Sequence, residues 1–195
     1  VMSITGSEET APLRVGYPVA DTIGGITAAF AVSSALVRQA RTGEGEFIDV
    51  SMLDSTVVTM GWVVSNFLIA GKTPRPMGNE NFTAAPSGAF RTGNGLLNIA
   101  ANKQEQFAAL AEAIGRADLV SDARFAERET RKVNRKALTV EIEAALAAKS
   151  AGEWEALLSK TGVPAGRVLS VSEVLDHPQI LERQLGLLQA QLLAL

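Results

Sequence analysis

The stretch Pro18-Val19-Ala20-Asp21-Thr22-Ile23-Gly24-Gly25 places a single carboxylate between an apolar lead-in and a pair of glycines. An almost uncharged run, Ile26–Val37, follows it. The alanines and apolar side chains of this run predict a long helix over about residues 23–40. Arg38 and Arg41 stand at its end, where cations suit the negative end of a helix dipole.

An alternation of helix, turn and strand follows from this point. Thr42–Glu46 contains two glycines and is typical of a turn, and Phe47–Met52 alternates as a strand does. The apolar run over about Leu53–Ala70 predicts a second helix. Helix, short turn, strand and helix is the order of an α/β layer, so the first part of the chain predicts the α/β fold class.

A second region begins after Gly71–Asn79, a segment with two prolines and two glycines that predicts a linker. The turn Thr92–Gly95 lies between two apolar segments and predicts a β-hairpin. Helices are expected over about 104–114 and 134–148. Two further helices are expected to begin at the capping-box patterns Ser150–Glu153 and Ser170–Glu173. This half predicts a small α+β domain.

Composition excludes several classes of protein. A hydrophobic fraction of 47% is ample for a folded core, and a net charge of −3 with interspersed signs argues against nucleic acid or a membrane surface as a partner. The absence of Cys excludes disulfides and thiolate metal sites, and with one His we expect no metal centre. The uncharged runs Thr22–Val37 and Ser55–Gly71 fall short of the roughly 20 residues that span a bilayer. We therefore expect buried helices and a cytoplasmic protein.

Asp21 has two interpretations. On spacing alone it is most simply the N-cap of the predicted helix, because Asp is among the best capping residues. The alternative is a nucleophile, with Gly24 and Gly25 leaving room for a ligand beside the backbone. Free N–H groups at the start of a helix could also stabilise an oxyanion there.

Other candidate residues have simpler structural interpretations. Ala85–Ala89 predicts a turn or loop, Glu127–Lys132 predicts a solvated helix face, and His177 predicts an exposed or capping residue. Trp62 and Trp154 are expected in the core.

Five parts of the chain carry a family resemblance, in order: Met2–Gly6, Arg14–Asp21, Arg41–Met52, Ala85–Thr92, and Gly162–Gly166 with Asp176–Gln179. Together they resemble the class III CoA-transferases, the CaiB/BaiF family. The resemblance implies part of a Rossmann-like large domain followed by a small α+β domain. It also implies a partial chain, without the family's N-terminal half and C-terminal return, which fits a sequence that begins at Val1 without Met.

The resemblance implies four parts along the chain: 1–71 in a large CoA-binding α/β domain that carries the nucleophile, 72–84 as linker, 85–175 as small α+β domain, and 176–195 as the start of a return toward the large domain.

The resemblance also implies an activity. Asp21 would attack an acyl-CoA thioester, and coenzyme A would pass to a carboxylic acid through a covalent aspartyl intermediate. Met52, Gly24 and Gly25 would line the CoA site, while Ser87 and Gly88 would lie near a loop that shields the intermediates. No permanently bound cofactor is implied, since CoA and acyl-CoA are substrates. The acyl group and the acceptor acid are not readable from the sequence.

Two alternatives stay open. One is an acyl-CoA racemase or epimerase of the same superfamily, in which the equivalent Asp acts as acid or base, although Thr22-Ile23 resembles the transferases more. The other is an inactive fragment. The resemblance further implies an interlocked homodimer, with small-molecule acyl-CoA and carboxylic acid as the other partners.

Overall fold

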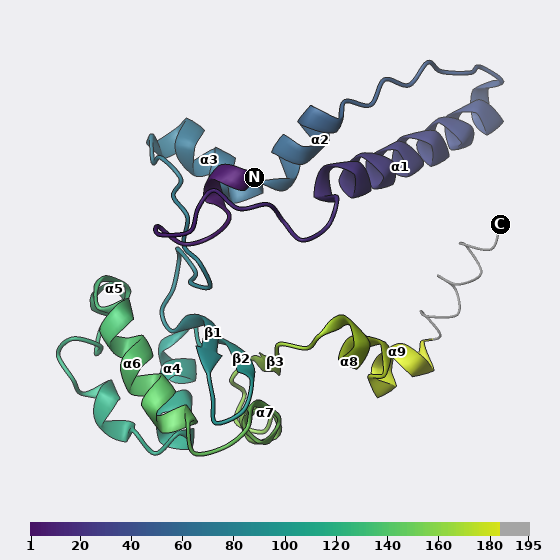
Figure 1. Cartoon of the computed structure of the whole chain (residues 1–195). Helices are drawn as coiled ribbons and strands as arrows, with labels where there is room; N and C mark the ends of the chain where they lie inside the picture. Colours follow the sequence, from purple (N-terminus) through teal and green to yellow (C-terminus); the bar gives the residue numbers. More distant parts are fainter. Residues whose placement is uncertain (184–195) are drawn as a thin grey trace. The chain divides into compact units, whose positions relative to one another are not determined.

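A computed structural model describes residues 1–183, which divide into two compact units, Val1–Asn79 and Glu80 onward (Figure 1). The first unit contains a short 3-10 helix and three α-helices: η1 (Met2–Ile4), α1 (Val19–Thr42), α2 (Met52–Thr59) and α3 (Gly61–Ala70). The predicted first helix is confirmed and is longer at both ends.

Helix α1 accommodates its Ser and Thr residues by bonding them to its own backbone. The hydroxyls of Thr27 and Ser33 donate to the carbonyls four residues earlier, at 2.9 and 2.8 Å. The helix ends at Gly43, whose φ of 75° is left-handed and whose N–H donates to the Gln39 carbonyl at 2.8 Å. A glycine is favoured there because it has no Cβ to oppose that conformation.

The strand predicted at Phe47–Met52 is not formed, because residues 43–51 have no regular secondary structure. A strand needs a neighbour that completes its backbone hydrogen bonds, and none of the described residues pairs with this segment. Arg38 ties the segment back to α1 through Glu44 at 3.2 Å and Glu46 at 2.6 Å.

The predicted second helix is interrupted. It breaks at Gly61, where φ is +38° and where the axes of α2 and α3 bend by 79°. Ser51 begins α2, since its side chain accepts a hydrogen bond from the Asp54 N–H at 3.1 Å. Met52 is therefore the first residue of α2 rather than the end of a strand.

The three helices of the first unit expose a large apolar surface. The exposed side chains include Ile26, Phe30, Leu36, Phe47, Leu53, Val58, Trp62, Phe67, Leu68 and Ile69. By length and composition, α1 could cross a membrane, and α2 with α3 could if the bent pair were one span, while almost none of α1 is buried within this chain. Trp62 is 56% exposed, so its expected place in the core is wrong.

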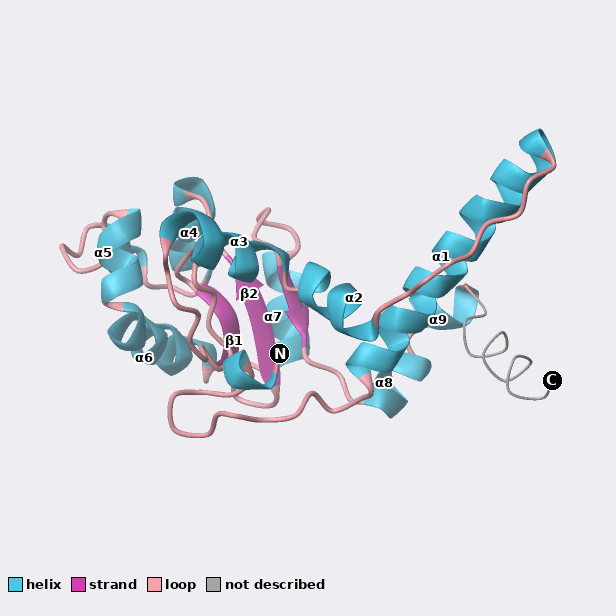
Figure 2. Ribbon diagram, turned by 90° about the horizontal axis from the view of Figure 1, so that it is seen from above, coloured by secondary structure: helices cyan, strands magenta, loops and turns pink. Residues whose placement is uncertain are grey.

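The second unit is built on a three-stranded antiparallel sheet in the order β1-β2-β3. Its strands are β1 (Ser87–Arg91), β2 (Leu96–Ala100) and β3 (Ala165–Arg167). The predicted hairpin is confirmed, with Phe90 opposite Leu97. Helices surround this sheet (Figures 1 and 2), with α6 in contact with β1 and α7 in contact with β2 and β3.

The helices of this unit are α4 (Gln104–Ala113), η2 (Ala117–Val120), α5 (Arg128–Val133), α6 (Arg135–Leu146), α7 (Ala151–Leu158), α8 (Val171–Leu175) and α9 (Pro178–Glu182). The expected helices over 104–114 and 134–148 are confirmed as α4 and α6. Both capping boxes are also confirmed. The Ser150 hydroxyl accepts from the Glu153 N–H, and Ser170 does the same for Glu173.

One hydrophobic core fills this unit. Its members come from the sheet, the helices and the loops between them: Phe90, Leu97, Ile99, Ala101, Phe107, Leu110, Ile114, Leu119, Phe125, Leu138, Ile142, Leu146, Ala151, Trp154, Leu158 and Val163. Trp154 is 3% exposed, as expected for a core residue, and its indole N–H donates to the Leu146 carbonyl at 2.8 Å. The buried polar atom is thus satisfied, which removes the cost of burying it.

The hairpin turn is fitted against the end of α6. The Gly93 N–H donates to the Lys149 carbonyl at 2.9 Å. A Cβ on Gly93 would lie 2.6 Å from the Ala147 carbonyl oxygen, closer than side chains are found. Glycine is needed here because of this close approach of two backbones.

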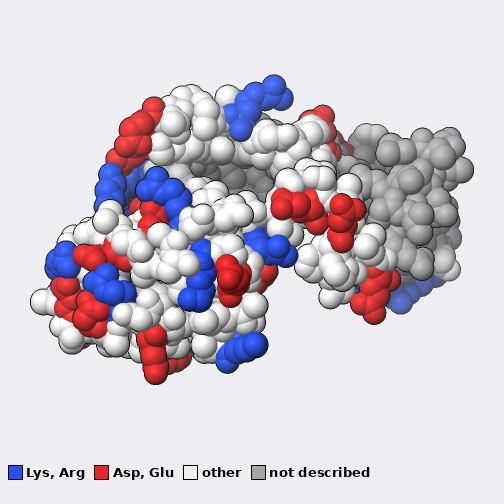
Figure 3. Space-filling view, turned by 60° about the horizontal axis from the view of Figure 1, so that its bottom comes forward, with Lys and Arg blue, Asp and Glu red and all other residues white. Residues whose placement is uncertain are grey.

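Charged side chains of both signs are interspersed over the face seen in Figure 3. Several are paired. Arg91 on β1 binds Glu143 on α6 at 2.7 Å, and Arg167 on β3 binds Glu155 on α7 at 2.8 Å. Each pair links a strand to a helix, although exposed pairs of this kind are individually weak.

Candidate functional site

Asp21 is not the N-cap of α1. The N-cap position is Pro18, with no side-chain cap, and Asp21 is the third residue of the helix. The helix begins earlier than expected because the Pro18 carbonyl already accepts the first helical hydrogen bond, from the Thr22 N–H at 3.0 Å. Proline suits this position since its φ, −74° here, is fixed near the helical value.

The Asp21 carboxylate is exposed, and in the described part of the chain it forms no hydrogen bond or ion pair. It lies in the first turn of α1, where the N–H groups of Ala20 and Asp21 itself have no intrahelical partner. These dipoles favour negative charge at this end of the helix. The Asp21 side chain is therefore not bonded to the backbone as a capping residue would be.

Gly24 and Gly25 follow Asp21 by three and four residues, so they lie one helical turn further along the same face. The two glycines differ in their surroundings. Gly24 is buried, and a Cβ placed on it would lie 3.2 Å from Met52 Cγ. A Cβ on Gly25 would meet nothing within 4 Å. Gly24 admits the Met52 side chain, and Gly25 leaves open space beside it.

Met52 reaches this face from α2. Ser51 fixes the start of that helix through its bond to the Asp54 N–H, so Met52 projects from the first helical position. Its side chain packs on Gly24 and is still 48% exposed. The structure thus brings three of the predicted site residues onto adjoining turns of two helices: Gly24, Gly25 and Met52 beside Asp21. The capping role of Ser51 was missed, although the pattern Ser-x-x-Asp at 51–54 signals it.

Ser87 and Gly88 belong to the second unit. The sequence predicts a loop there, and this is wrong: both residues start β1, where Ser87 pairs with Ala100 and Gly88 with Ile99. Backbone pairing with β2 continues back to these two residues, which includes them in the strand. Both are half-buried.

No group of three His, Asp or Glu side chains that could hold a metal ion occurs among residues 1–183. His177 is the N-cap of α9, and its Nδ1 accepts a hydrogen bond from the Gln179 N–H at 3.2 Å. This confirms the capping interpretation of that residue.

Comparison with known proteins assigns the chain to a family. A family model described as CoA-transferase family III matches residues 1–187. The chain therefore belongs to this family, as the sequence motifs indicate.

Two curated relatives are similar over most of the chain. Mouse succinyl-CoA:glutarate CoA-transferase is 32% identical, with 95% of this chain and 42% of the relative covered. Acetyl-CoA:oxalate CoA-transferase of Acetobacter aceti is 34% identical, with 95% of this chain and 48% of the relative covered. The chain spans less than half the length of these two relatives.

The fold is shared with a solved structure of the same group. A crystal structure of a CaiB/BaiF family protein from Brucella suis matches with a TM-score of 0.81 and 34% identity, covering 93% of this chain and 48% of that one. The predicted α/β class is confirmed at the level of this family fold, while the strand over 47–52 is not formed here.

Proposed function

We propose that the protein carrying this chain transfers coenzyme A from an acyl-CoA to a carboxylic acid, with Asp21 as the covalent nucleophile. The observation that supports this most directly is the Asp21 carboxylate itself. It is exposed and unpaired on the first turn of α1, with Gly24 and Gly25 on the next turn and Met52 packed on Gly24 from α2. Membership of a family whose curated members include named CoA-transferases supplies the reaction class.

The proposed steps balance without any external reagent. An Asp21 oxygen attacks the thioester carbonyl carbon, the C–S bond breaks, and CoA thiolate leaves behind a mixed anhydride. The thiolate attacks the aspartyl carbonyl, which releases the donor acid as its carboxylate and leaves an aspartyl-CoA thioester. The acceptor carboxylate then attacks the aspartyl thioester carbonyl, which releases CoA thiolate and forms a second mixed anhydride. The thiolate attacks the acceptor acyl carbon of this anhydride and displaces the Asp21 carboxylate. Acceptor-CoA and free Asp21 result.

The surroundings of Asp21 suit this sequence. Each attack generates an oxyanion next to Asp21, and the free N–H groups at the start of α1 favour negative charge. Gly25 leaves space for a substituent at the carboxylate, since a Cβ there would meet nothing within 4 Å. Met52 offers a partly exposed apolar surface to the acyl-CoA. We also propose that Ser87 and Gly88 lie near a loop that shields the intermediates. We propose too that the chain divides into large-domain, linker and small-domain parts, as the family resemblance implies.

The test is Asp21→Asn in the full-length enzyme. We expect the variant to fold and to lose about 3 or more orders of magnitude in turnover, because an amide is not a nucleophile toward the thioester. Asp54→Asn is the matched control, since Asp54 lies at the equivalent third position of α2. Hydroxylamine trapping after incubation with acyl-CoA should mark Asp21. Near-wild-type transfer by Asp21→Asn, in protein checked for deamidation, rules the mechanism out.

Deuterium exchange, combined with the hydroxylamine trapping, distinguishes the transferase from the racemase alternative. A racemase would exchange the α-proton of an acyl-CoA for deuterium in the absence of any acceptor acid, and would yield no hydroxamate at Asp21. The names of the curated relatives favour transfer. We further propose that the full-length protein is a cytoplasmic, interlocked homodimer with no permanently bound cofactor.

A further inference from the structure

The segment between α1 and α2 has a length that fits the distance it must cover. We call residues 43–51 the return segment, because they lead from the C-terminal end of α1 back toward its first turns, where α2 begins (Figures 1 and 2). Gly43 ends α1, while Met52 begins α2 and packs on Gly24. These contacts fix both ends of the return segment relative to α1.

Helix geometry gives the distance between those ends. Gly43 is 19 residues beyond Gly24, which at about 1.5 Å per residue is about 28 Å along the axis of α1. Met52 follows Gly43 by nine residues, and at about 3.3 Å per residue an extended chain of this length reaches about 30 Å. The Met52 Cα lies 4.0 Å from the position of a Cβ on Gly24. Nearly the whole reach of the return segment is therefore used to bring Met52 to Gly24.

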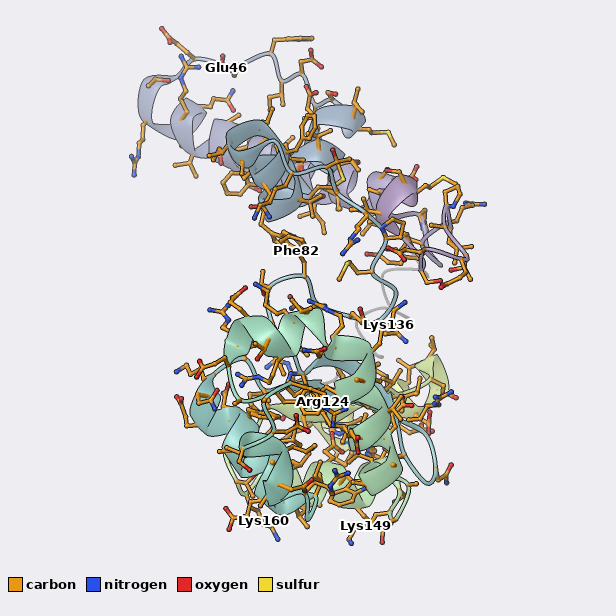
Figure 4. The ribbon with its side chains drawn as sticks, turned by 90° about the vertical axis from the view of Figure 1, so that its left-hand side faces the viewer. Glu46, Phe82, Arg124, Lys136, Lys149 and Lys160 are labelled. Carbon is orange, nitrogen blue, oxygen red and sulfur yellow. The ribbon has the colours of Figure 1, made fainter. Side chains whose placement is uncertain are left out.

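Short-range contacts hold the two ends of the return segment. At its start, Arg38 on α1 binds Glu44 at 3.2 Å and Glu46, which is labelled in Figure 4, at 2.6 Å. At its end, the Ser51 carbonyl accepts hydrogen bonds from the N–H and the hydroxyl of Ser55 at 3.0 and 2.8 Å, and Ser55 is buried. Because Arg38 precedes the last turn of α1, its two ion pairs direct the first residues of the segment back along the helix.

We propose that the length of the return segment, together with Arg38, positions Met52 against Gly24 and so shapes the surface beside Asp21. Arg38 is then a positioning residue that acts through Met52, and the consequence for acyl-CoA binding rests on the proposed function. Because little reach is left over, removal of one residue draws Met52 about 3.3 Å toward the C-terminal end of α1. An added residue only introduces slack and leaves Met52 at Gly24. A loose loop would tolerate both changes equally.

Disulfide cross-linking measures this placement without using enzyme activity. The position of a Cβ on Gly24 lies 4.0 Å from Met52 Cβ, inside the range of about 3.5–4.5 Å that a disulfide requires. The 195 residues contain no Cys, so Gly24→Cys combined with Met52→Cys introduces one defined pair into this part of the protein. In the folded full-length protein we expect oxidised glutathione to close this pair, seen as the loss of two free thiols. Each single cysteine variant is the control and should show no such loss.

The dependence on length is tested in the protein that carries this cysteine pair. Deletion of Gly45 should slow cross-linking about tenfold or more, since it moves the two Cβ positions beyond the reach of a disulfide. Insertion of one glycine after Gly45 is the matched control and should leave the rate unchanged, and circular dichroism identifies the variants that fold. A folded deletion variant that cross-links at the parental rate overturns the proposal. An insertion that slows cross-linking as much as the deletion does the same.

Arg38→Met tests the two ion pairs by point substitution and keeps the test decisive if the deletion variant does not fold. We expect it to slow cross-linking about threefold, the size of effect that exposed ion pairs give. Arg41→Met is the matched control, because Arg41 lies in the last turn of α1 and forms no hydrogen bond or ion pair among the described residues. Unaltered cross-linking in Arg38→Met overturns the role of Arg38.

Kinetics of the enzyme with Gly24 and Met52 intact distinguish positioning from stability. Arg38→Met should raise the KM for acyl-CoA about threefold with kcat little changed, and Arg38→Lys should restore KM in part. A purely structural role would instead lower the active fraction, and therefore kcat, without changing KM. If Asp21→Asn leaves transfer intact, the proposed function fails, while the cross-linking rates still decide how Met52 is positioned.

Discussion

Met52 on α2 fills the space that the missing side chain of Gly24 leaves on α1, with its Cγ 3.2 Å from where a Cβ would be. The two residues are 28 positions apart in the sequence, and their contact joins the two helices of the proposed site. Because Gly24 lies one turn beyond Asp21, the packing of Met52 decides how the surface beside the carboxylate is shaped.

Gly24→Ala should therefore act through Met52. The added methyl must displace the Met52 side chain by a few tenths of an ångström. We expect the KM for acyl-CoA in the full-length enzyme to rise several-fold, with global stability changed by less than about 1 kcal/mol because alanine favours the helix. Combining it with Met52→Ala should restore KM in part, with a coupling of about 1 kcal/mol.

Gly25→Ala is the comparison for the double-mutant cycle of Gly24 and Met52, because its methyl would enter open space and touch no side chain. It should raise KM by obstructing the ligand directly, and Met52→Ala should not relieve it. Equal coupling of both glycines to Met52 would contradict the packing described here.

Gly93→Ala should destabilise the second unit. A methyl group at 2.6 Å from the Ala147 carbonyl oxygen forces the hairpin turn and the end of α6 apart. We expect a loss of about 2 kcal/mol in the free energy of unfolding, measured by urea titration. Gly152→Ala is the control, since its methyl would make an ordinary 3.5 Å contact with Arg167 and alanine favours α7. A neutral Gly93→Ala would show that the turn can move at little cost.

The capping boxes should make the second unit acid-sensitive. Hydrogen bonds from the Ser150 hydroxyl and backbone N–H lower the pKa of Glu153, and Ser170 does the same for Glu173. A carboxyl with a lowered folded-state pKa stabilises the fold above its unfolded pKa, and this stabilisation is lost as pH falls through the folded pKa. Urea unfolding should therefore show decreasing stability on acidification below the ordinary range of a glutamate.

Glu153→Gln combined with Glu173→Gln should reduce this loss of stability at acidic pH. Glu105→Gln on α4 is the matched control, because Glu105 forms no hydrogen bond or ion pair among the described residues. If Glu105→Gln reduces the loss of stability at acidic pH as much as the double variant does, the capping boxes are not the cause of that loss.

The exposed apolar surface of α1 to α3 motivates a prediction about assembly. A surface of this size is unusual on an isolated soluble monomer, and a symmetric partner could cover it. We expect the full-length protein to be a dimer that does not exchange subunits without unfolding. Two differently tagged folded preparations should give no hybrid dimers within minutes of mixing. Rapid hybrids would exclude interlocking, and a monomer in light scattering at low micromolar concentration would exclude the dimer.

Local signals made much of the second unit predictable. The hairpin, α4, α6 and both capping boxes follow from turn residues, helical spacing and Ser-x-x-Glu patterns that act within a few residues. The strand prediction for Phe47–Met52 was wrong because a strand needs a neighbouring strand, and local alternation does not show whether one is present. The predicted second helix is interrupted at Gly61 because its positive φ is incompatible with a continuous α-helix, and the apolar run does not signal this.

The site was predictable in part. Asp21, Gly24 and Gly25 lie on one helix, so their spacing places them together. The contact of Met52 with Gly24 is long-range and was not predicted, since the resemblance to a family implied only that both residues line the CoA site. The predicted solvated face at Glu127–Lys132 is wrong at Arg131, which is 1% exposed. Its burial was missed because Arg131 stands among charged neighbours and gives no sign in the sequence of being buried.

Each unit of the chain holds one of its two tryptophans, and they differ in environment. Trp154 is enclosed in the core of the second unit, with its N–H bonded to a carbonyl, while Trp62 on α3 is more than half exposed. Within this chain the two indoles should therefore emit at separate wavelengths, the enclosed one to the blue. Replacing either by phenylalanine leaves a label-free optical reporter for the other unit, so the order in which the two units melt can be read from intrinsic fluorescence.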